Sequence, residues 1–269
     1  MFMRILLHLS PAMNAAHSQE ATIACELLSM LRQELDRRAI LIAERCTTAK
    51  QLRQHHPDII HIIGWDADAT QKLTAHAEAL HIPYVVTPLG AFLPWRGCKW
   101  RAFPDTTIVA SSKIERDHLQ DHVQSERLRL VSNPVSTTAI TAQEYATEMM
   151  NTYEQAIRLH DEAIRSGIGK RVQQMDDIEK DMADILQEAL YIGYLHQRGD
   201  VTQASLDHLS YTMIHADYDE ALMAERLEQL RFTSFFAQLE TLLAEQSTLT
   251  EGFMPIEAKP NKLITTINP

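Results

Sequence analysis

Apolar residues in the first 135 positions follow two alternating patterns. Runs of consecutive apolar residues are typical of strands buried on both faces, and stretches with apolar residues every three or four positions are typical of helices. The strand-like runs are 4–9, 39–43, 57–64, 83–87, 106–110 and 127–132, and the helix-like stretches are 20–35, 48–55, 68–80 and 113–122. This order predicts an α/β fold with a Rossmann-like parallel sheet covered by helices. Ligands of such sheets bind at the carboxyl ends of the strands.

The strand-like runs stop at about residue 138. Four helices are expected beyond it, over 141–165, 175–192, 202–214 and 219–245, with Ser166-Gly167-Ile168-Gly169 interrupting the first. Residues 248–269 contain three prolines and read as a loose tail. The pattern therefore predicts a Rossmann-like domain over 1–137, an all-α region over 138–247 and a C-terminal tail.

Three helix starts have the spacing of a capping box, in which a hydroxyl residue and a Glu or Gln three positions later satisfy each other's backbone amides. These pairs are Thr48 with Gln51, Ser112 with Glu115, and Thr141 with Glu144.

Composition and charge narrow the function classes. Apolar residues make up 45% and charged residues 23%, values ordinary for a soluble globular protein. The formal net charge of -11 argues against nucleic acid as a partner, because phosphate binding draws on Lys and Arg. Three scattered cysteines, no signal-peptide pattern and no run of ~20 apolar residues predict a cytoplasmic protein without a transmembrane segment.

Four segments of the first half resemble family-4 glycosyltransferases in their order and spacing. They are PDIIHIIGW (57–65), IPYVVTPLGAFLPW (82–95), TTIVASSKIERDHL (106–119) and RLRLVSNPV (127–135). The resemblance implies a GT-B fold, in which an N-terminal domain binds the acceptor and a C-terminal domain binds the nucleotide-sugar. It covers about half of the chain, so only the acceptor-side domain is matched.

The chain departs from that family at positions that take part in the chemistry. Leu89 stands where the family has the histidine of its PHG motif, and leucine neither donates a hydrogen bond nor carries charge. Ile63 replaces the second histidine of an HIHG motif. The loop after the first strand, residues 10–16, lacks glycine and includes Pro11, whereas the family has a Gly-rich loop facing the donor phosphates.

The donor-binding half is also missing from the sequence pattern. No series of parallel strands is expected after residue 138, and only residues 251–258 (EGFMPIEA) resemble the family's donor motif. Their glutamates are separated by five residues instead of seven, and no strand precedes them. The sequence predicts a glycosyltransferase-like protein of surface-polysaccharide or glycoconjugate biosynthesis that is catalytically impaired on its own. It has no cofactor, and a nucleotide-sugar binds only if a partner supplies the donor site. The alternative is a non-catalytic subunit that binds a glycan acceptor or docks on an intact glycosyltransferase.

The candidate acceptor-site residues follow from the resemblance and from the tendency of ligands to bind at the carboxyl ends of parallel strands. They are His61, Gly64, Trp65, Pro88, Leu89, Gly90, Trp95 and Asn133, and no catalytic residue is assigned. His61 has a second interpretation, as a hydrogen-bonded core histidine. Tryptophan faces pack against sugar rings, although Trp95 has a second interpretation as a loop anchor. Beside Trp95, Arg96, Lys99 and Arg101 could attract a phosphate-bearing acceptor or lipid headgroup, or form a solvated loop.

Metal binding and partner binding each rest on weaker patterns. Asp66 and Asp68 have D-x-D spacing, but helix capping is the favoured interpretation. His118 and His122 lie one helical turn apart without a third ligand, so no metal site is predicted. Phe235, Phe236 and several methionines form either core or a partner-binding face, which leaves a partner glycosyltransferase or a homo-oligomer through the helical half as alternatives.

Overall fold

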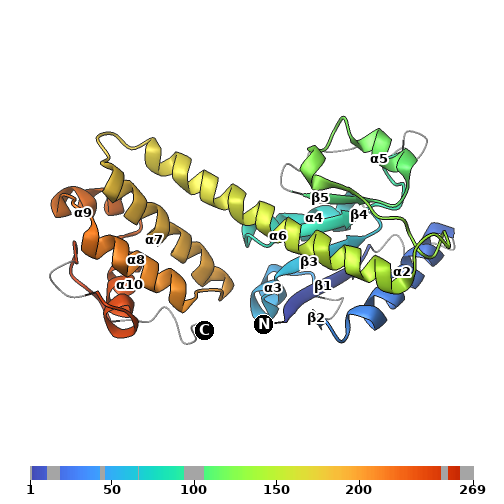
Figure 1. Ribbon diagram of the computed structural model, residues 1–269, viewed down its shortest axis with the longest axis horizontal. Helices are drawn as coiled ribbons and strands as arrows, with labels where there is room; N and C mark the ends of the chain where they lie inside the picture. The colour runs from blue at the N-terminus through green and yellow to red at the C-terminus, as the bar shows by residue number, and fades with distance from the viewer. Residues whose placement is uncertain are drawn as a thin grey trace. The chain divides into compact units, whose positions relative to one another are not determined.

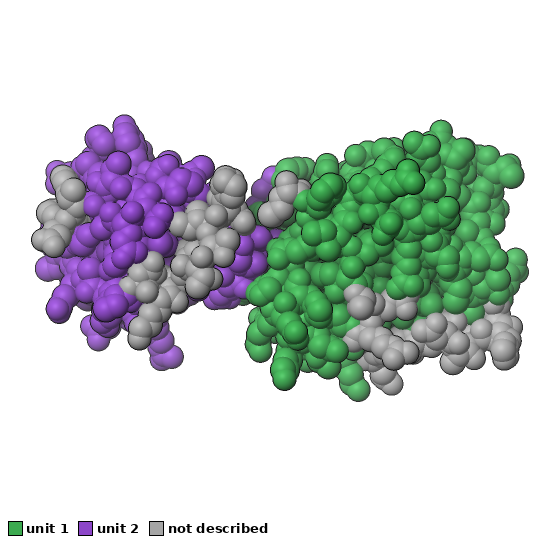
Figure 2. All heavy atoms as spheres, turned by 90° about the horizontal axis from the view of Figure 1, so that it is seen from below, with its two compact units in different colours: residues 1–161 green, residues 162–269 purple. Residues whose placement is uncertain are grey.

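The computed structural model describes residues 2–10, 19–42, 46–65, 67–93, 106–249 and 254–260, with the side chains of 67–69 left out. The chain forms two compact units, residues 1–161 and 162–269 (Figure 2). Each unit has its own apolar core.

The first unit contains the predicted parallel sheet. Its order is β2-β1-β3-β4-β5-β6, and every neighbouring pair is parallel (Figure 1). The strands are β1 (Met3–Leu9), β2 (Ala39–Ile42), β3 (Ile59–Ile63), β4 (Tyr84–Thr87), β5 (Thr107–Ala110) and β6 (Leu128–Leu130). Five of these strands lie within the runs read from the sequence, and β1 begins one residue before its run, at Met3. The runs identify the inner strands because a strand buried on both faces must be apolar throughout.

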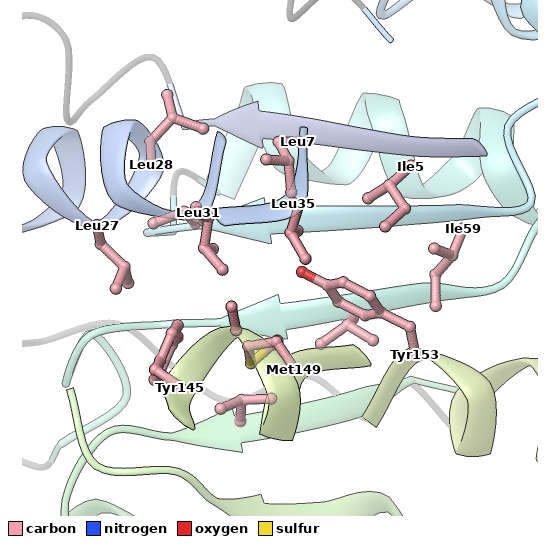
Figure 3. Packing of buried hydrophobic residues seen from close by; sticks show 14 of the residues in the cluster. Ile5, Leu7, Leu27, Leu28, Leu31, Leu35, Ile59, Tyr145, Met149 and Tyr153 are labelled. Atoms are coloured by element: carbon pink, nitrogen blue, oxygen red, sulfur yellow. The ribbon is translucent and has the colours of Figure 1, made fainter. Parts of the chain in front are cut away.

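Helices cover both faces of this sheet. Alternate residues of β3 point to opposite sides, so Ile59 and Ile63 join one apolar cluster while Ile60 and Ile62 join the other. The first cluster receives α2 (Gln19–Leu35) and the first part of α6 (Ala142–Gln173), and Figure 3 shows these two helices meeting over the strands. The second cluster receives α3 (Ala49–His55), α4 (Ala67–Ala79) and α5 (Lys113–Leu119).

The expected interruption of the long helix at residues 166–169 is wrong, since α6 runs unbroken to Gln173. A glycine inside a helix costs about 1 kcal/mol relative to alanine, which packing can offset. At Gly169 a Cβ would lie 3.3 Å from Oε1 of Gln187, so the glycine allows a close approach to α7 (Lys180–Arg198). Ile168 packs against the core of the second unit, and Val172 is fully buried in it.

The second unit is helical in its described residues. It contains α7, α8 (Gln203–His215), α9 (Glu220–Gln229) and α10 (Thr233–Gln246) around one apolar cluster. The single helix expected over 219–245 is wrong: it breaks at Arg231, which has a φ of 56°. That left-handed residue reverses the chain, and Phe232 then packs onto Phe235, with ring centroids 4.8 Å apart.

The sequence-based boundary after residue 137 marks the end of the strands, whereas the compact units divide after Asp161. The reason is that Tyr145, Ala146, Met149, Tyr153 and Ala156 of α6 belong to the core of the first unit. Within the described part of the tail, residues 254–260, the Lys259 amide donates to the Ala237 carbonyl (2.9 Å), so this segment lies against α10. None of the described helices is long and apolar enough to span a membrane.

Candidate functional site

The candidate site lies at the carboxyl edge of the sheet, where backbone hydrogen bonds join the strand ends. The Ser10 amide, just after β1, donates to the Ile63 carbonyl (2.9 Å). The Gly64 amide, just after β3, donates to the Thr87 carbonyl at the end of β4 (2.8 Å). The structure therefore brings Gly64 next to the Pro88-Leu89-Gly90 segment. The Ser10 hydroxyl is buried and has no hydrogen-bond partner in the described part of the chain.

The Leu89-Gly90 turn is left-handed at both residues, with φ values of 52° and 81°. Glycine adopts this conformation freely, but a leucine there is strained. Leu89 is half-buried, and its side chain packs against the cluster formed by α2 and α6. At the position where the resemblance implies a polar histidine, the side chain is thus part of the hydrophobic core.

A buried carboxylate holds this turn in place. Glu115 Oε1 accepts from the Gly90 amide (2.6 Å), and Oε2 accepts from the Ser111 amide (2.8 Å), so one side chain links the ends of β4 and β5. Burial raises the pKa of Glu115, and the two backbone hydrogen bonds partly oppose that rise. Glu115 was not among the residues proposed from the sequence.

The capping box expected at Ser112 and Glu115 is therefore only half formed. The Ser112 hydroxyl accepts from the Glu115 amide (3.2 Å), but the Glu115 carboxylate bonds Ser111 and Gly90 instead of the Ser112 amide. The other two boxes, Thr48 with Gln51 and Thr141 with Glu144, form as predicted.

His61 lies in the middle of β3 and is fully buried beneath α6. Its Nδ1 lies 2.7 Å from the Tyr153 hydroxyl, and its Nε2 lies 2.8 Å from Thr87 Oγ1. Burial lowers the pKa of His61 to about 3, so the ring is neutral at physiological pH. This geometry matches the interpretation as a hydrogen-bonded core histidine, and a contact with an acceptor stays a prediction.

Tyr145 and Tyr153 extend this polar cluster from the helix side. Both tyrosines are buried in the first unit and project from α6 towards the sheet (Figure 3). Tyr145 also hydrogen-bonds Thr87, and burial raises the pKa of both hydroxyls. Thr87 immediately precedes Pro88, so α6 fixes the strand end from which the Leu89-Gly90 turn departs.

The remaining candidates that can be described, Trp65, Pro88 and Asn133, are largely buried. Trp65 is 7% exposed and packs against Phe92, with ring centroids 4.9 Å apart, so little of its ring is open to a sugar. Pro88 is buried as well. Asn133 Oδ1 accepts from the Val135 amide (2.9 Å) and thereby closes the turn after β6.

Several predictions fall on residues outside the described part of the chain. They concern Trp95, the basic residues 96, 99 and 101, the Asp66 carboxylate and the glutamate at 251. The side chain of Asp68 is likewise not described. Among the residues the structure does describe, no group of three or more His, Cys, Asp or Glu side chains could hold a metal ion.

Two titratable side chains at this edge are held by hydrogen bonds within the protein. His61 is hydrogen-bonded through both ring nitrogens, and both oxygens of Glu115 accept from backbone amides. A general base must reach the proton it removes, and neither group has a free atom directed outward. Leu89 and Gly90 are half-exposed at this edge.

Comparison with known proteins matches part of the first unit. Residues 15–139 match the family model for Glycosyltransferase Family 4, so this part of the chain is similar to a family-4 glycosyltransferase domain. The match ends three residues before α6 begins. No curated protein and no solved structure matches the chain.

Proposed function

We propose that this protein is a glycosyltransferase-like protein of surface-polysaccharide or glycoconjugate biosynthesis, and that it does not transfer sugar by itself. The observation that supports impairment is the Leu89-Gly90 turn, where an apolar side chain packs into the core at the position of the family's histidine. The uniformly helical character of the described residues from 142 to 249 is further support, because a donor domain needs its own parallel strands.

The acceptor would then be bound mainly at the carboxyl edge by Leu89 and Gly90, which are half-exposed, with the buried Gly64 and Asn133 shaping the backbone beside them. His61 and Trp65 would support that surface from below, since both are buried. The acceptor would be a glycan or a lipid-linked sugar. A nucleotide-sugar would enter only where a partner glycosyltransferase supplies the donor site.

The test is donor turnover by the full chain. Release of nucleoside diphosphate is followed with UDP-glucose, UDP-N-acetylglucosamine, UDP-galactose and GDP-mannose, with and without lipid-linked sugar acceptors. Release at the level of a protein-free blank supports impairment. Acceptor-dependent release above that level by the unmodified chain would contradict it.

The role of Leu89 is tested with two variants that both place a polar side chain on the left-handed backbone of this position. Leu89→His restores the imidazole, whereas Leu89→Asn tolerates the left-handed backbone but supplies no imidazole. Turnover gained by Leu89→His and not by Leu89→Asn would indicate that one lost side chain limits activity. If neither variant gains turnover while both stay folded, the absence of a donor site is the sufficient cause.

The second candidate is a non-catalytic module, favoured by the closed hydrogen bonding of Glu115 and His61. Binding of the full chain to a glycan array, without any turnover, would support it. Gly90→Ala alters the edge backbone and should weaken such binding, while the exposed variant Glu26→Gln on α2 should leave it unchanged.

A further inference from the structure

Strand β6 forms an open edge of the sheet in the first unit. It pairs only with β5, and the Val131 amide just beyond it donates to the Ala110 carbonyl (3.1 Å). Successive residues of a parallel strand direct their backbone groups to opposite sides, so Arg129 and Val131 face β5 while Leu130 faces away. No hydrogen bond of the Leu130 amide or carbonyl is found within the described residues. An edge of this kind is a template for another strand.

A groove runs along this edge, between β6 and α6. It consists of two adjacent hollows of about 420 Å³ and 390 Å³, which share Leu130, Val131 and Glu148. Leu130, on the open strand, is 40% exposed. We call this feature the edge groove.

Charge changes sign along the edge groove. The hollow at the amino end of β6 is lined by Arg129 and by Arg116, which is paired with Asp117, and the hollow at the carboxyl end is lined by Glu144. Glu148 lies in both. Arg129 and Glu148 are exposed, and neither forms an ion pair with any described residue. A surface that runs from basic to acidic is complementary to its own reversed copy.

We propose that two copies of this chain pair through β6, antiparallel, across a two-fold axis at Leu130. Because Leu130 directs its backbone outward, it would face Leu130 of the partner subunit as a hydrogen-bonded pair that exchanges two N–H···O=C bonds. Arg129 then lies opposite Val131 of the partner subunit.

The charged groups meet in the same register. The side chains of Arg129 and Val131 project to the same face of the sheet, and Val131 packs in the cluster that α6 covers. Arg129 therefore approaches α6 of the partner, where Glu148 of the partner subunit is exposed. The two-fold axis repeats this contact, which gives two Arg–Glu pairs per dimer. This interface uses the sheet of the first unit and is independent of the proposed function and of the helical half.

Charge reversal provides a specific test. Sedimentation velocity of the full chain is measured from about 1 to 100 μM, for the unmodified protein and for Arg129→Glu and Glu148→Arg. Each single variant places like charges together twice, and we expect dimerisation to weaken by roughly tenfold or more. An equimolar mixture should form a heterodimer, because one chain then supplies both acids and the other both bases. Glu154→Arg is the matched control on the same helix, since its exposed carboxylate does not line the edge groove.

A second variant tests the strand pairing itself. Leu130→Pro removes the outward amide, and proline is tolerated on an edge strand because the ladder to β5 does not use that amide. Symmetry removes both bonds of the central pair, so the variant should be monomeric with unchanged circular dichroism and tryptophan emission. A monomeric parent protein at 100 μM, a mixture that does not heterodimerise, or a Leu130→Pro dimer as tight as the parent would each overturn the proposal.

Discussion

The carboxylate of Glu115 offers the sharpest test of how the candidate site is built. It accepts two backbone hydrogen bonds, of 2.6 Å from Gly90 and 2.8 Å from Ser111, at the ends of two adjacent strands. Glu115→Ala removes both acceptors, and Glu115→Gln keeps one acceptor oxygen while its NH₂ group meets the other donor. Glu115→Ala also releases the left-handed Leu89-Gly90 turn, whereas Glu115→Gln can still hold one of the two amides.

The expected loss follows from the number and environment of these bonds. A hydrogen bond to a charged group contributes about 1.5–3 kcal/mol. Gly90 and Ser111 are half-exposed, so water replaces part of each bond, and removing a buried carboxylate recovers part of its desolvation. We expect Glu115→Ala to lower the free energy of unfolding by about 2–4 kcal/mol, and Glu115→Gln by about 1–2 kcal/mol.

The assay is urea unfolding followed by tryptophan fluorescence. All three tryptophans lie within residues 1–161, so the signal reports on the unit that contains Glu115. Hydrogen exchange of the Gly90 and Ser111 amides is measured in parallel; both should become faster in Glu115→Ala, and one of them in Glu115→Gln. Glu26→Gln, on the exposed side of α2, is the control and should stay within about 0.5 kcal/mol of the parent.

The pH dependence gives the same prediction a second readout. Since burial raises the pKa of Glu115, the folded protein binds this proton more tightly than the unfolded chain. The stability that the bound proton contributes is fully present below 4.5, the pKa of Glu115 in the unfolded chain. It is lost as pH rises through the raised pKa of the folded protein. Glu115→Gln should lack this component. An alanine variant as stable as the parent, with the Gly90 amide still protected, would refute the reasoning.

Three further predictions concern buried polar groups and the turn. Tyr153→Phe should lower the free energy of unfolding by about 1–3 kcal/mol, because it leaves His61 Nδ1 without its partner. ¹⁵N NMR of the parent protein should find the His61 ring neutral from pH 5 to 8, and a ring that titrates near 6.5 would contradict its burial. Gly90→Ala should lower the free energy of unfolding, measured in urea, by about 1–2 kcal/mol, because Gly90 has a φ of 81° and the new Cβ would lie 3.2 Å from Leu93 Cδ1. An unchanged unfolding midpoint would contradict this. Burial raises the pKa of Glu240 to about 8, and a hydrogen bond from the Ile256 backbone partly opposes that rise. The stability that the protonated carboxyl contributes is therefore lost as pH rises from 4.5 through 8, and Glu240→Gln should slow hydrogen exchange in residues 254–260 at pH 9; equal exchange rates would contradict this.

The secondary structure of the first unit could be predicted because its signals are local. Each buried strand must be apolar along its length, and each helix repeats its apolar residues every three or four positions. The errors occurred where packing overrides local preference. Gly167 and Gly169 favour a break, yet α6 continues because its neighbours bury Ile168 and Val172. α9 ends before Arg231, whose backbone is left-handed, although the sequence has no glycine or proline there to indicate a helix end.

The connections within the site could not be predicted in the same way. Glu115 is 25 residues from Gly90, and Tyr153 is 92 residues from His61. No periodicity joins such pairs, since only the completed sheet brings them together. A glutamate three positions after a serine also has a local explanation as a capping box, which concealed its role at Gly90. The positions of Gly64 and Pro88 were predictable because strand order alone determines where strand ends meet.

The boundary of the family match has a consequence for Leu89. The match ends at residue 139, but Tyr145, Met149 and Tyr153 complete the core against which Leu89 packs. A leucine in this place is therefore accommodated by a helix outside the matched segment. Leu89→His would put a polar ring against that apolar cluster, where an unpaired polar group costs about 1–3 kcal/mol. A failure to gain activity can be assigned to the missing donor site only if Leu89→His keeps the unfolding free energy of Leu89→Asn. The loss of the histidine and the packing of α6 thus have to be tested as one structural unit.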